Sequence, residues 1–249
     1  MKTVLHIPHS SEHIPSEFLK YFRLSDKDLK NEILKMTDHF TDELFSIEHS
    51  DFRKITFPVS RLLCDPERFE DDALEPMCAV GMGCIYEKTH DGRPLKGIEC
   101  IRDILIEKFY KKHHEKLFDA VDEIISKYNA ALIIDCHSFP KIPLPYELNK
   151  SQLRPPICLG VDEFHTPKYL IEYFSESFNK YGYSTSINEP FSGSIVPIQF
   201  YQKNTNVHSI MIEIRRDLYM DEKLGQKSHG FIDLKNTLNK ILCDLDKIV

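Results

Sequence analysis

The sequence lacks several patterns that would assign it to a familiar class. Its 249 residues include seven cysteines, an odd number, and no C-x-x-C pair, which argues against both a disulfide framework and a structural zinc knuckle. The N-terminus enters a polar motif too early for a signal peptide, and about 18 consecutive apolar residues occur nowhere. We therefore expect a cytoplasmic protein with reduced thiols and no membrane-spanning helix.

An excess of positive charge is also missing. The formal net charge is -7, and no long basic run occurs. An acidic balance argues against nucleic acid or an anionic membrane surface as the main partner. If the substrate is anionic, a few local arginines must attract it despite the repulsion from the net negative charge of the protein.

Common catalytic templates are absent too. There is no G-x-S-x-G nucleophile elbow and no P-loop, and Gly81-Met82-Gly83 lacks the third glycine of a dinucleotide fingerprint. The pair His114-Glu115 does not continue as H-E-x-x-H, because Phe118 occupies the second histidine position. His9 and Glu12 have the H-x-x-E spacing of some zinc exopeptidases, a short pattern that chance also produces.

What remains is the composition and patterning of an α/β protein. Hydrophobic residues make up 41% and charged residues 29%, enough for a sizeable core in one domain spanning residues 1–249. Apolar runs predict strands at 3–7, 52–63, 130–134, 157–161 and 207–214. Helical spacing predicts helices at 26–36, 37–47 (with Thr37 as N-cap), 101–127, 167–181 and 234–249. Long loops are expected at 67–99 and 140–156. This alternation predicts a single-domain fold with a central, largely parallel sheet flanked by helices.

Polar side chains stand where three of these strands end. His9 follows the first strand, Asp135 and His137 follow 130–134, and Glu213 lies near the end of 207–214. Ligands gather at the carboxyl ends of strands in open α/β sheets, so two histidines and a carboxylate there could hold zinc with one open position. A further carboxylate could act as general base. A lone histidine after a strand is more often a hydrogen-bonding cap, and Glu213 could simply pair with the neighbouring Arg215 or Arg216.

Three other segments offer groups that could bind a substrate. Arg61 and Arg68 flank Asp65, either as a surface salt-bridge cluster or as a clamp for a substrate carboxylate. Arg215 and Arg216 form a second candidate clamp. Asn188 opens a turn-forming stretch, which is either only a loop or part of a small polar pocket.

Taken in order, the motifs of residues 7–222 resemble the N-formylglutamate amidohydrolase family. Each motif is short and weak alone, but their joint order and spacing make coincidence improbable. They are Ile7-Pro8-His9-Ser10-Ser11, the segment from Thr37 to Phe45, the cluster from Ser60 to Phe69, Gly81-Met82-Gly83 with Asp91-Gly92-Arg93-Pro94, the segment from Tyr110 through His114 to Leu117, Asp135-Cys136-His137-Ser138, the stretch from Asn188 to Gly193, and Glu213 with Tyr219-Met220-Asp221-Glu222.

The resemblance implies a phosphorylase/hydrolase-like fold similar to the zinc exopeptidases, with a mixed sheet. It implies hydrolysis of N-formyl-L-glutamate, a small anionic substrate, to formate and L-glutamate in histidine degradation, with Zn²⁺ or another divalent transition metal as cofactor. By resemblance, the metal ligands are His9, Asp38 and His137, with Glu12 as the rival of Asp38. Glu213 is the general base and acid. The groups that hold or polarise substrate are His114, Arg61, Arg68, Asn188 and Arg215.

The sequence departs from the family pattern at a few positions. Many members have glycine where Ser11 and Ser194 stand, and Lys112-His113 precedes His114 where Pro-Tyr is common. These changes affect the shape of the pocket more than the metal chemistry. Two alternatives therefore stay open: an amidase or peptidase acting on another N-acyl amino acid or small peptide, and a non-catalytic small-ligand binding protein of the same fold. The sequence makes no prediction about oligomeric state.

Overall fold

The computed structural model describes residues 2–47, 49, 51–151 and 153–245. Within them, the central sheet has six strands in the order β2-β1-β3-β6-β4-β5. The strands are β1 (Lys2–Ile7), β2 (Phe52–Thr56), β3 (Ala131–Phe139), β4 (Ile157–Gly160), β5 (Thr185–Ile187) and β6 (Val207–Arg215). Strands β2, β1, β3 and β6 are parallel, while β4 runs antiparallel to β6. The predicted mixed, mostly parallel sheet is confirmed.

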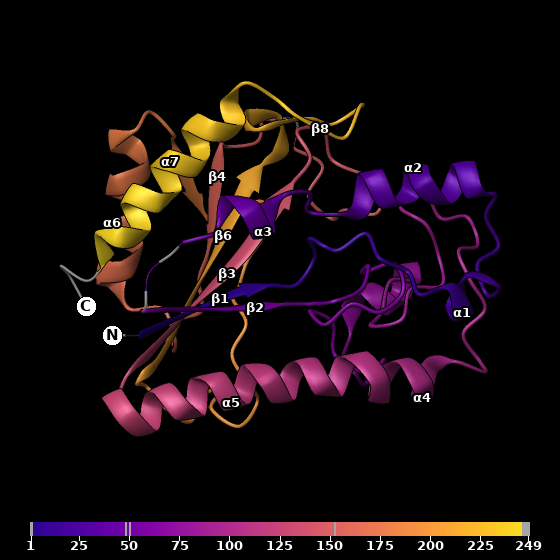
Figure 1. Ribbon diagram of the computed structural model, residues 1–249, viewed down its shortest axis with the longest axis horizontal. Helices are drawn as coiled ribbons and strands as arrows, with labels where there is room; N and C mark the ends of the chain where they lie inside the picture. Colours follow the sequence, from indigo (N-terminus) through magenta and orange to yellow (C-terminus); the bar gives the residue numbers. More distant parts are fainter. Residues whose placement is uncertain (1, 48, 50, 152, 246–249) are drawn as a thin grey trace.

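Helices cover both faces of the sheet (Figure 1), with α5 along one face and α6 and α7 on the other. The helices are α1 (Ser16–Leu19), α2 (Asp26–Met36), α3 (Thr41–Leu44), α4 (Arg102–Leu105), α5 (Lys111–Tyr128), α6 (Lys168–Lys180) and α7 (Gly230–Cys243). Shorter elements are the 3-10 helices η1 (Pro76–Val80) and η3 (Arg216–Leu218), the π-helix η2 (Ile106–Tyr110) between α4 and α5, and the hairpin of β7 (Met220–Asp221) and β8 (Gln226–Lys227). No helix in the described part of the chain is long and apolar enough to cross a bilayer.

Strand alternation divides the core and positions the polar side chains. Successive residues of a strand point to opposite faces. In β3, Ile134 packs in the large cluster under α6 and α7, whereas Ile133 packs against α5 together with Val4 of β1. His6, two residues after Val4, and Asp135, two after Ile133, therefore point to the α5 face, nearer the carboxyl ends of their strands.

Several predicted boundaries are wrong. No helix begins at Thr37: this residue is the C-cap of α2, and α3 starts only at Thr41, because Phe40 adopts the left-handed conformation with φ 63°. The strand predicted to end at 134 continues to Phe139, so Asp135 and His137 lie inside β3 rather than after it. The strand predicted over 52–63 ends at Thr56.

The last helix also differs from its prediction. It starts at Gly230, four residues before the expected Leu234. The backbone of Gly230 comes close to that of Leu218, and an added Cβ would lie 2.3 Å from the Leu218 carbonyl oxygen. Residues 246–249 of the predicted helix lie outside the described part of the chain.

The segment from 57 to 101 extends beyond the carboxyl ends of β1 and β2, beside α1 and α2 (Figure 1). As predicted, most of it is irregular, with η1 as a short turn. Lys96 crosses its interior, buried, and donates hydrogen bonds to the carbonyl oxygens of Leu62 and Tyr86. Lys96 therefore links residues 62 and 86 of this segment, which carries several polar side chains toward the sheet.

Candidate metal centre

Three residues far apart in the sequence converge at the carboxyl ends of β1 and β3. His9 follows β1, Asp38 follows α2, and His137 lies in β3. Their ligand atoms all lie within 4.8 Å of one another, and all three side chains are buried. The amide of Asp38 donates to the carbonyl oxygen of His9 at 3.0 Å, which fixes one segment against the other.

The Nδ1 atoms of both histidines face the same oxygen. Asp38 Oδ2 lies 3.3 Å from Nδ1 of His137 and 3.7 Å from Nδ1 of His9. The imidazole ring centroids of the two histidines are 5.0 Å apart. Two nitrogens and one carboxylate oxygen are a donor set that zinc accepts in catalytic sites.

The other ring nitrogen of each histidine is held by a second buried aspartate. His9 Nε2 bonds to Asp65 Oδ1 at 2.8 Å, and His137 Nε2 bonds to Asp135 Oδ1 at 2.9 Å. A carboxylate on Nε2 keeps the proton there and leaves the Nδ1 lone pair for a metal. Each histidine thus belongs to a carboxylate–histidine pair aimed at one point.

The charge states of this cluster also suit a cation. Burial would raise the pKa of Asp38, but the hydrogen bond from His137, the nearby imidazole of His9 and the charge of Arg216 hold it well below its usual range. Burial would likewise lower the pKa of His137, yet Asp135 and Asp38 raise it well above normal. Without a metal, a proton on His137 therefore balances the carboxylates. A divalent metal would take the place of that proton.

Unpaired buried atoms complete the test of fit. His9 Nδ1 is buried and has no hydrogen-bond partner among the described residues. Burying a polar atom without a partner is unfavourable unless a ligand satisfies it. The residues present therefore fit a divalent transition metal at His9, Asp38 and His137.

Glu213 lies beside this cluster on the neighbouring strand. Its position in β6 is opposite His137 of β3 in the parallel register, so both side chains point to the α5 face. Glu213 is 7% exposed, and its Oε2 has no hydrogen-bond partner among the described residues. Burial raises the pKa of Glu213 to about 8, against the opposing charge of His137. A carboxylate with these properties can accept and return a proton near neutral pH.

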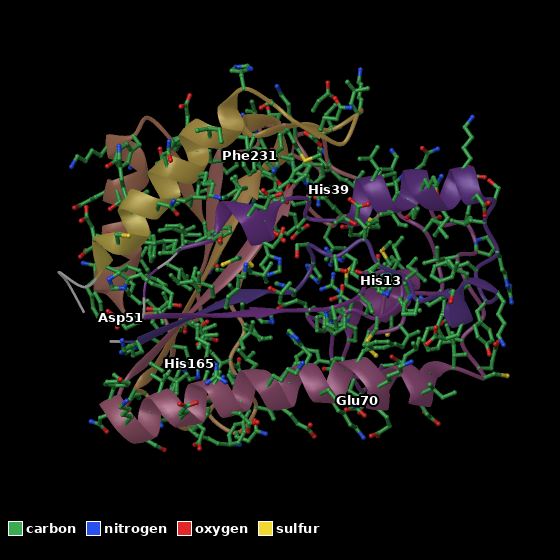
Figure 2. All side chains as sticks on the ribbon, in the orientation of Figure 1. His13, His39, Asp51, Glu70, His165 and Phe231 are labelled. Carbon is green, nitrogen blue, oxygen red and sulfur yellow. The ribbon has the colours of Figure 1, made fainter. Side chains whose placement is uncertain are left out.

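Glu12, the rival of Asp38, lies elsewhere. Its side chain is 62% exposed, and it pairs with Nδ1 of His39 at 2.9 Å. His39 lies between α2 and α3 (Figure 2). The geometry therefore favours Asp38 over Glu12 as the carboxylate of the cluster.

The two predicted clamp arginines beside Asp65 differ in whether their nitrogen atoms have hydrogen-bond partners. Arg61 donates from Nη2 to Asp65 Oδ2 at 2.8 Å and so supports the aspartate that holds His9. Arg68 lies 4.0 Å from the same oxygen, and its buried Nε has no hydrogen-bond partner in the described part of the chain. Arg68 thus has one buried donor without a partner among the described residues, whereas Nε and Nη2 of Arg61 both donate to Asp65.

Arg215 and Asn188 have structural partners instead. Arg215 donates to Asp217 Oδ1 and to the carbonyl oxygen of Arg154, both at 2.6 Å. The neighbouring Arg216 points into the cluster, and its Nη2 bonds to Asp38 Oδ1 at 2.8 Å. Asn188 is exposed, and its Oδ1 accepts from Val161 at 2.8 Å. Its contacts hold the loop.

His114 lies at the start of α5, below the loop that carries Arg68. Its Nε2 bonds to the carbonyl oxygen of Pro66 at 3.0 Å, and its ring lies against that of Tyr110. Burial lowers the pKa of His114 to about 4. It is therefore a neutral side chain that supports this loop.

Sequence reasoning missed three residues next to the cluster: the buried His6 and His113, and the partly buried Glu67. His6 bonds through Nδ1 to Asp135 Oδ1 at 2.8 Å and through Nε2 to His113 Nε2 at 2.8 Å. Glu67 Oε1 lies 3.2 Å from His6 Nδ1. A signal for His6 existed: a histidine inside the run Thr3-Val4-Leu5-His6-Ile7 needs a polar partner once buried. Glu67 and His113 carried no comparable signal.

An α/β sheet with a histidine–carboxylate cluster at its strand ends is an arrangement that can hold a metal for hydrolysis. The chain belongs to the N-formylglutamate amidohydrolase family, whose family model matches residues 1–220. Family membership makes it an amidohydrolase, and the resemblance inferred from the sequence motifs is confirmed.

Solved structures show the same fold. The chain is similar to N-formylglutamate amidohydrolase from Ralstonia eutropha JMP134, with a TM-score of 0.86 at 20% identity over 100% of this chain and 94% of that one. It is also similar to a gene product from Agrobacterium tumefaciens, with a TM-score of 0.64 at 16% identity over 98% and 92% of the two chains. The comparison with curated proteins found no match.

Proposed function

We propose that this chain is a metal-dependent amide hydrolase that releases formate and L-glutamate from N-formyl-L-glutamate. The observation that carries the proposal is the convergence of His9, Asp38 and His137, with a buried aspartate behind each histidine. The family match supports the amide class of substrate. A cytoplasmic role in histidine breakdown belongs to the same proposal.

His9, Asp38 and His137 would hold the metal. When bound, Zn²⁺ or another divalent transition metal acts as a Lewis acid that polarises the amide carbonyl and acidifies water. The chain's own residues keep these three ligands oriented: Asp65 and Asp135 fix the histidine rings, and Arg216 fixes Asp38.

Glu213 would move the proton. Its unpaired Oε2 takes a proton from the attacking water, whose oxygen adds to the formyl carbon. As the carbon–nitrogen bond breaks, the same carboxyl group delivers that proton to the leaving nitrogen. Formate and the free amino group of glutamate result.

Arg68 would anchor the substrate through one of its carboxylates. Its buried Nε has no partner among the described residues, whereas Nε of Arg61 donates to Asp65 and Nε of Arg216 donates to Ser138. A guanidinium in a poorly solvated position binds carboxylates strongly and with defined geometry. This anchor would favour acidic N-acyl amino acids over neutral ones.

A substrate panel tests the proposal. Formate release from N-formyl-L-glutamate should exceed release from N-formyl-L-glutamine and N-formyl-L-alanine, and N-acetyl-L-glutamate and dipeptides should react more slowly. Faster hydrolysis of the N-acetyl or dipeptide substrates would replace the deformylase proposal by a broader amidase. Binding of N-formyl-L-glutamate without turnover of any member of the panel would indicate a non-catalytic binding protein.

A further inference from the structure

A second group of ligand atoms lies next to the first. His6 in β1 and Asp135 in β3 are direct neighbours in the parallel register, and Glu67 reaches them from the loop after β2. One nitrogen or oxygen from each residue lies within 4.8 Å of the other two. Nothing in the proposed hydrolysis uses Glu67 or His6.

The contacts inside this group leave one carboxylate oxygen unsatisfied. His6 Nδ1 faces Asp135 Oδ1 at 2.8 Å and Glu67 Oε1 at 3.2 Å. Glu67 Oε1 is buried and makes no hydrogen bond with any described residue. A single N–H cannot serve two carboxylates well. Two carboxylate groups that face one imidazole nitrogen inside the protein are stabilised either by a proton or by a cation between them.

The outer contacts of the group resemble those of a metal site. His6 Nε2 bonds to His113 Nε2 at 2.8 Å, so one of these nitrogens donates and the other accepts. If His6 carries its proton on Nε2, His113 accepts it and Nδ1 presents a lone pair to the two carboxylates. Asp135 is held in turn by His137 Nε2 and by the amide of Ile195 at 3.3 Å. Such outer contacts fix the orientation of metal ligands.

A third group of potential ligands differs in this respect. Glu32 uses both carboxylate oxygens on His90, accepting from its backbone amide and meeting Nδ1, each at 2.6 Å. Asp91, the third member, is exposed and bonds to Thr89 and Arg93. Hydrogen bonds within the protein already satisfy that group, and it contains no unpaired buried oxygen comparable to Glu67 Oε1.

We propose that His6, Glu67 and Asp135 bind a second divalent transition-metal ion, separate from the one at His9, Asp38 and His137. One imidazole nitrogen and two carboxylate oxygens suit zinc or manganese better than magnesium or calcium, which prefer oxygen ligands alone. Asp135 would contact this ion directly and, through His137, the first ion indirectly. Occupancy of the second site would thus stabilise the orientation of a ligand of the first.

Metal stoichiometry tests this proposal without reference to hydrolysis. The full-length protein is stripped with a chelator, equilibrated with Zn²⁺ alone, and its bound zinc is measured by mass spectrometry against protein concentration. Wild type should bind two ions per chain. Glu67→Gln, which keeps the shape but removes the charge, should bind one, while Asp38→Asn should lose the other. Glu70→Gln, an exposed change on the same loop (Figure 2), should bind two.

The outcomes separate the two sites. A single ion in wild type that Glu67→Gln retains and Asp38→Asn loses would overturn the second site and leave the first. Two ions in both wild type and Glu67→Gln would overturn it as well. A single ion lost only in Glu67→Gln would support this site and contradict the first. The number of zinc ions bound by the wild-type protein tests the proposal by itself. The proposal therefore stays falsifiable even if a variant folds poorly.

Discussion

Arg216 binds one carboxylate oxygen of Asp38 and leaves the other oxygen facing His9 and His137. Nη2 of Arg216 bonds to Oδ1 of Asp38 at 2.8 Å, while Oδ2 faces the two histidines. The guanidinium is itself held by Ser138 Oγ at 3.2 Å and by the carbonyl oxygen of Lys35 at 2.6 Å. Arg216 therefore orients Asp38 so that one carboxylate oxygen faces the candidate metal position between the histidines.

Removing Arg216 should destabilise the metal-free protein. In Arg216→Gln, Asp38 stays buried without its cation, and breaking a buried ion pair in this way costs about 3–5 kcal/mol. Urea denaturation of the metal-free protein measures the loss. Arg53→Gln removes an exposed pair with Glu123 and should cost no more than about 1 kcal/mol. Similar losses in the two variants would mean that the Arg216–Asp38 pair has no special role.

Asp65 should control metal affinity rather than chemistry. Asp65→Asn removes the charge that keeps the proton of His9 on Nε2, so affinity for Zn²⁺ should fall by about 10- to 100-fold. Competition with a chromogenic chelator measures this. Asp119→Asn, an exposed change on α5, is the matched control and should leave the affinity unchanged. Unchanged affinity in Asp65→Asn would show that this aspartate does not orient His9.

Glu213 should matter for turnover and not for metal binding. Glu213→Gln keeps the shape of the side chain but cannot accept a proton, so kcat should fall by about 10²- to 10⁴-fold while bound zinc stays the same. Steady-state kinetics and metal analysis on one preparation give both values. If the variant retains activity, another group transfers the proton.

Lys96 should make stability depend on pH. Burial lowers the pKa of Lys96 to about 7, from 10.5 in an unfolded chain. Between these values the unfolded chain holds more protons than the folded one, so the contribution of Lys96 to stability rises with pH. Comparing melting temperatures of parent and Lys96→Met from pH 7 to pH 10 isolates this term. The melting temperature of the parent should rise relative to that of Lys96→Met as pH increases. A constant difference would indicate that the pKa of Lys96 is not lowered in the folded protein.

The sequence singled out the candidate metal ligands but not most of the contacts around them. His9, His137 and Glu213 were selected because they stand at or near the ends of apolar strands, where polar residues need a structural or chemical reason. Family resemblance supplied Asp38, and the structure places it between the histidines. Strand periodicity also predicted the sheet, although β3 extends through Asp135 and His137, because both polar side chains have buried partners on the α5 face.

Side-chain directions that depend on residues far away in the sequence could not be predicted. Arg215 and Arg216 are neighbours, and no local pattern tells which one turns toward Asp38, 178 residues away in the chain. Glu67 lies in an irregular loop, where no periodicity indicates the direction of its side chain. The helix predicted from Thr37 is wrong for a local reason: Phe40 adopts the left-handed conformation and separates Asp38 from α3.

The most direct test of the central claim measures metal and formate release in one experiment. Chelator-treated protein is titrated with Zn²⁺ while formate release from N-formyl-L-glutamate is followed, and the titration is repeated with Asp38→Asn. We predict that metal-free wild type is inactive, that activity returns in proportion to added Zn²⁺, and that Asp38→Asn stays inactive at matched metal concentration. Full activity of the metal-free protein, or of Asp38→Asn, would contradict a metal-dependent hydrolase built on His9, Asp38 and His137.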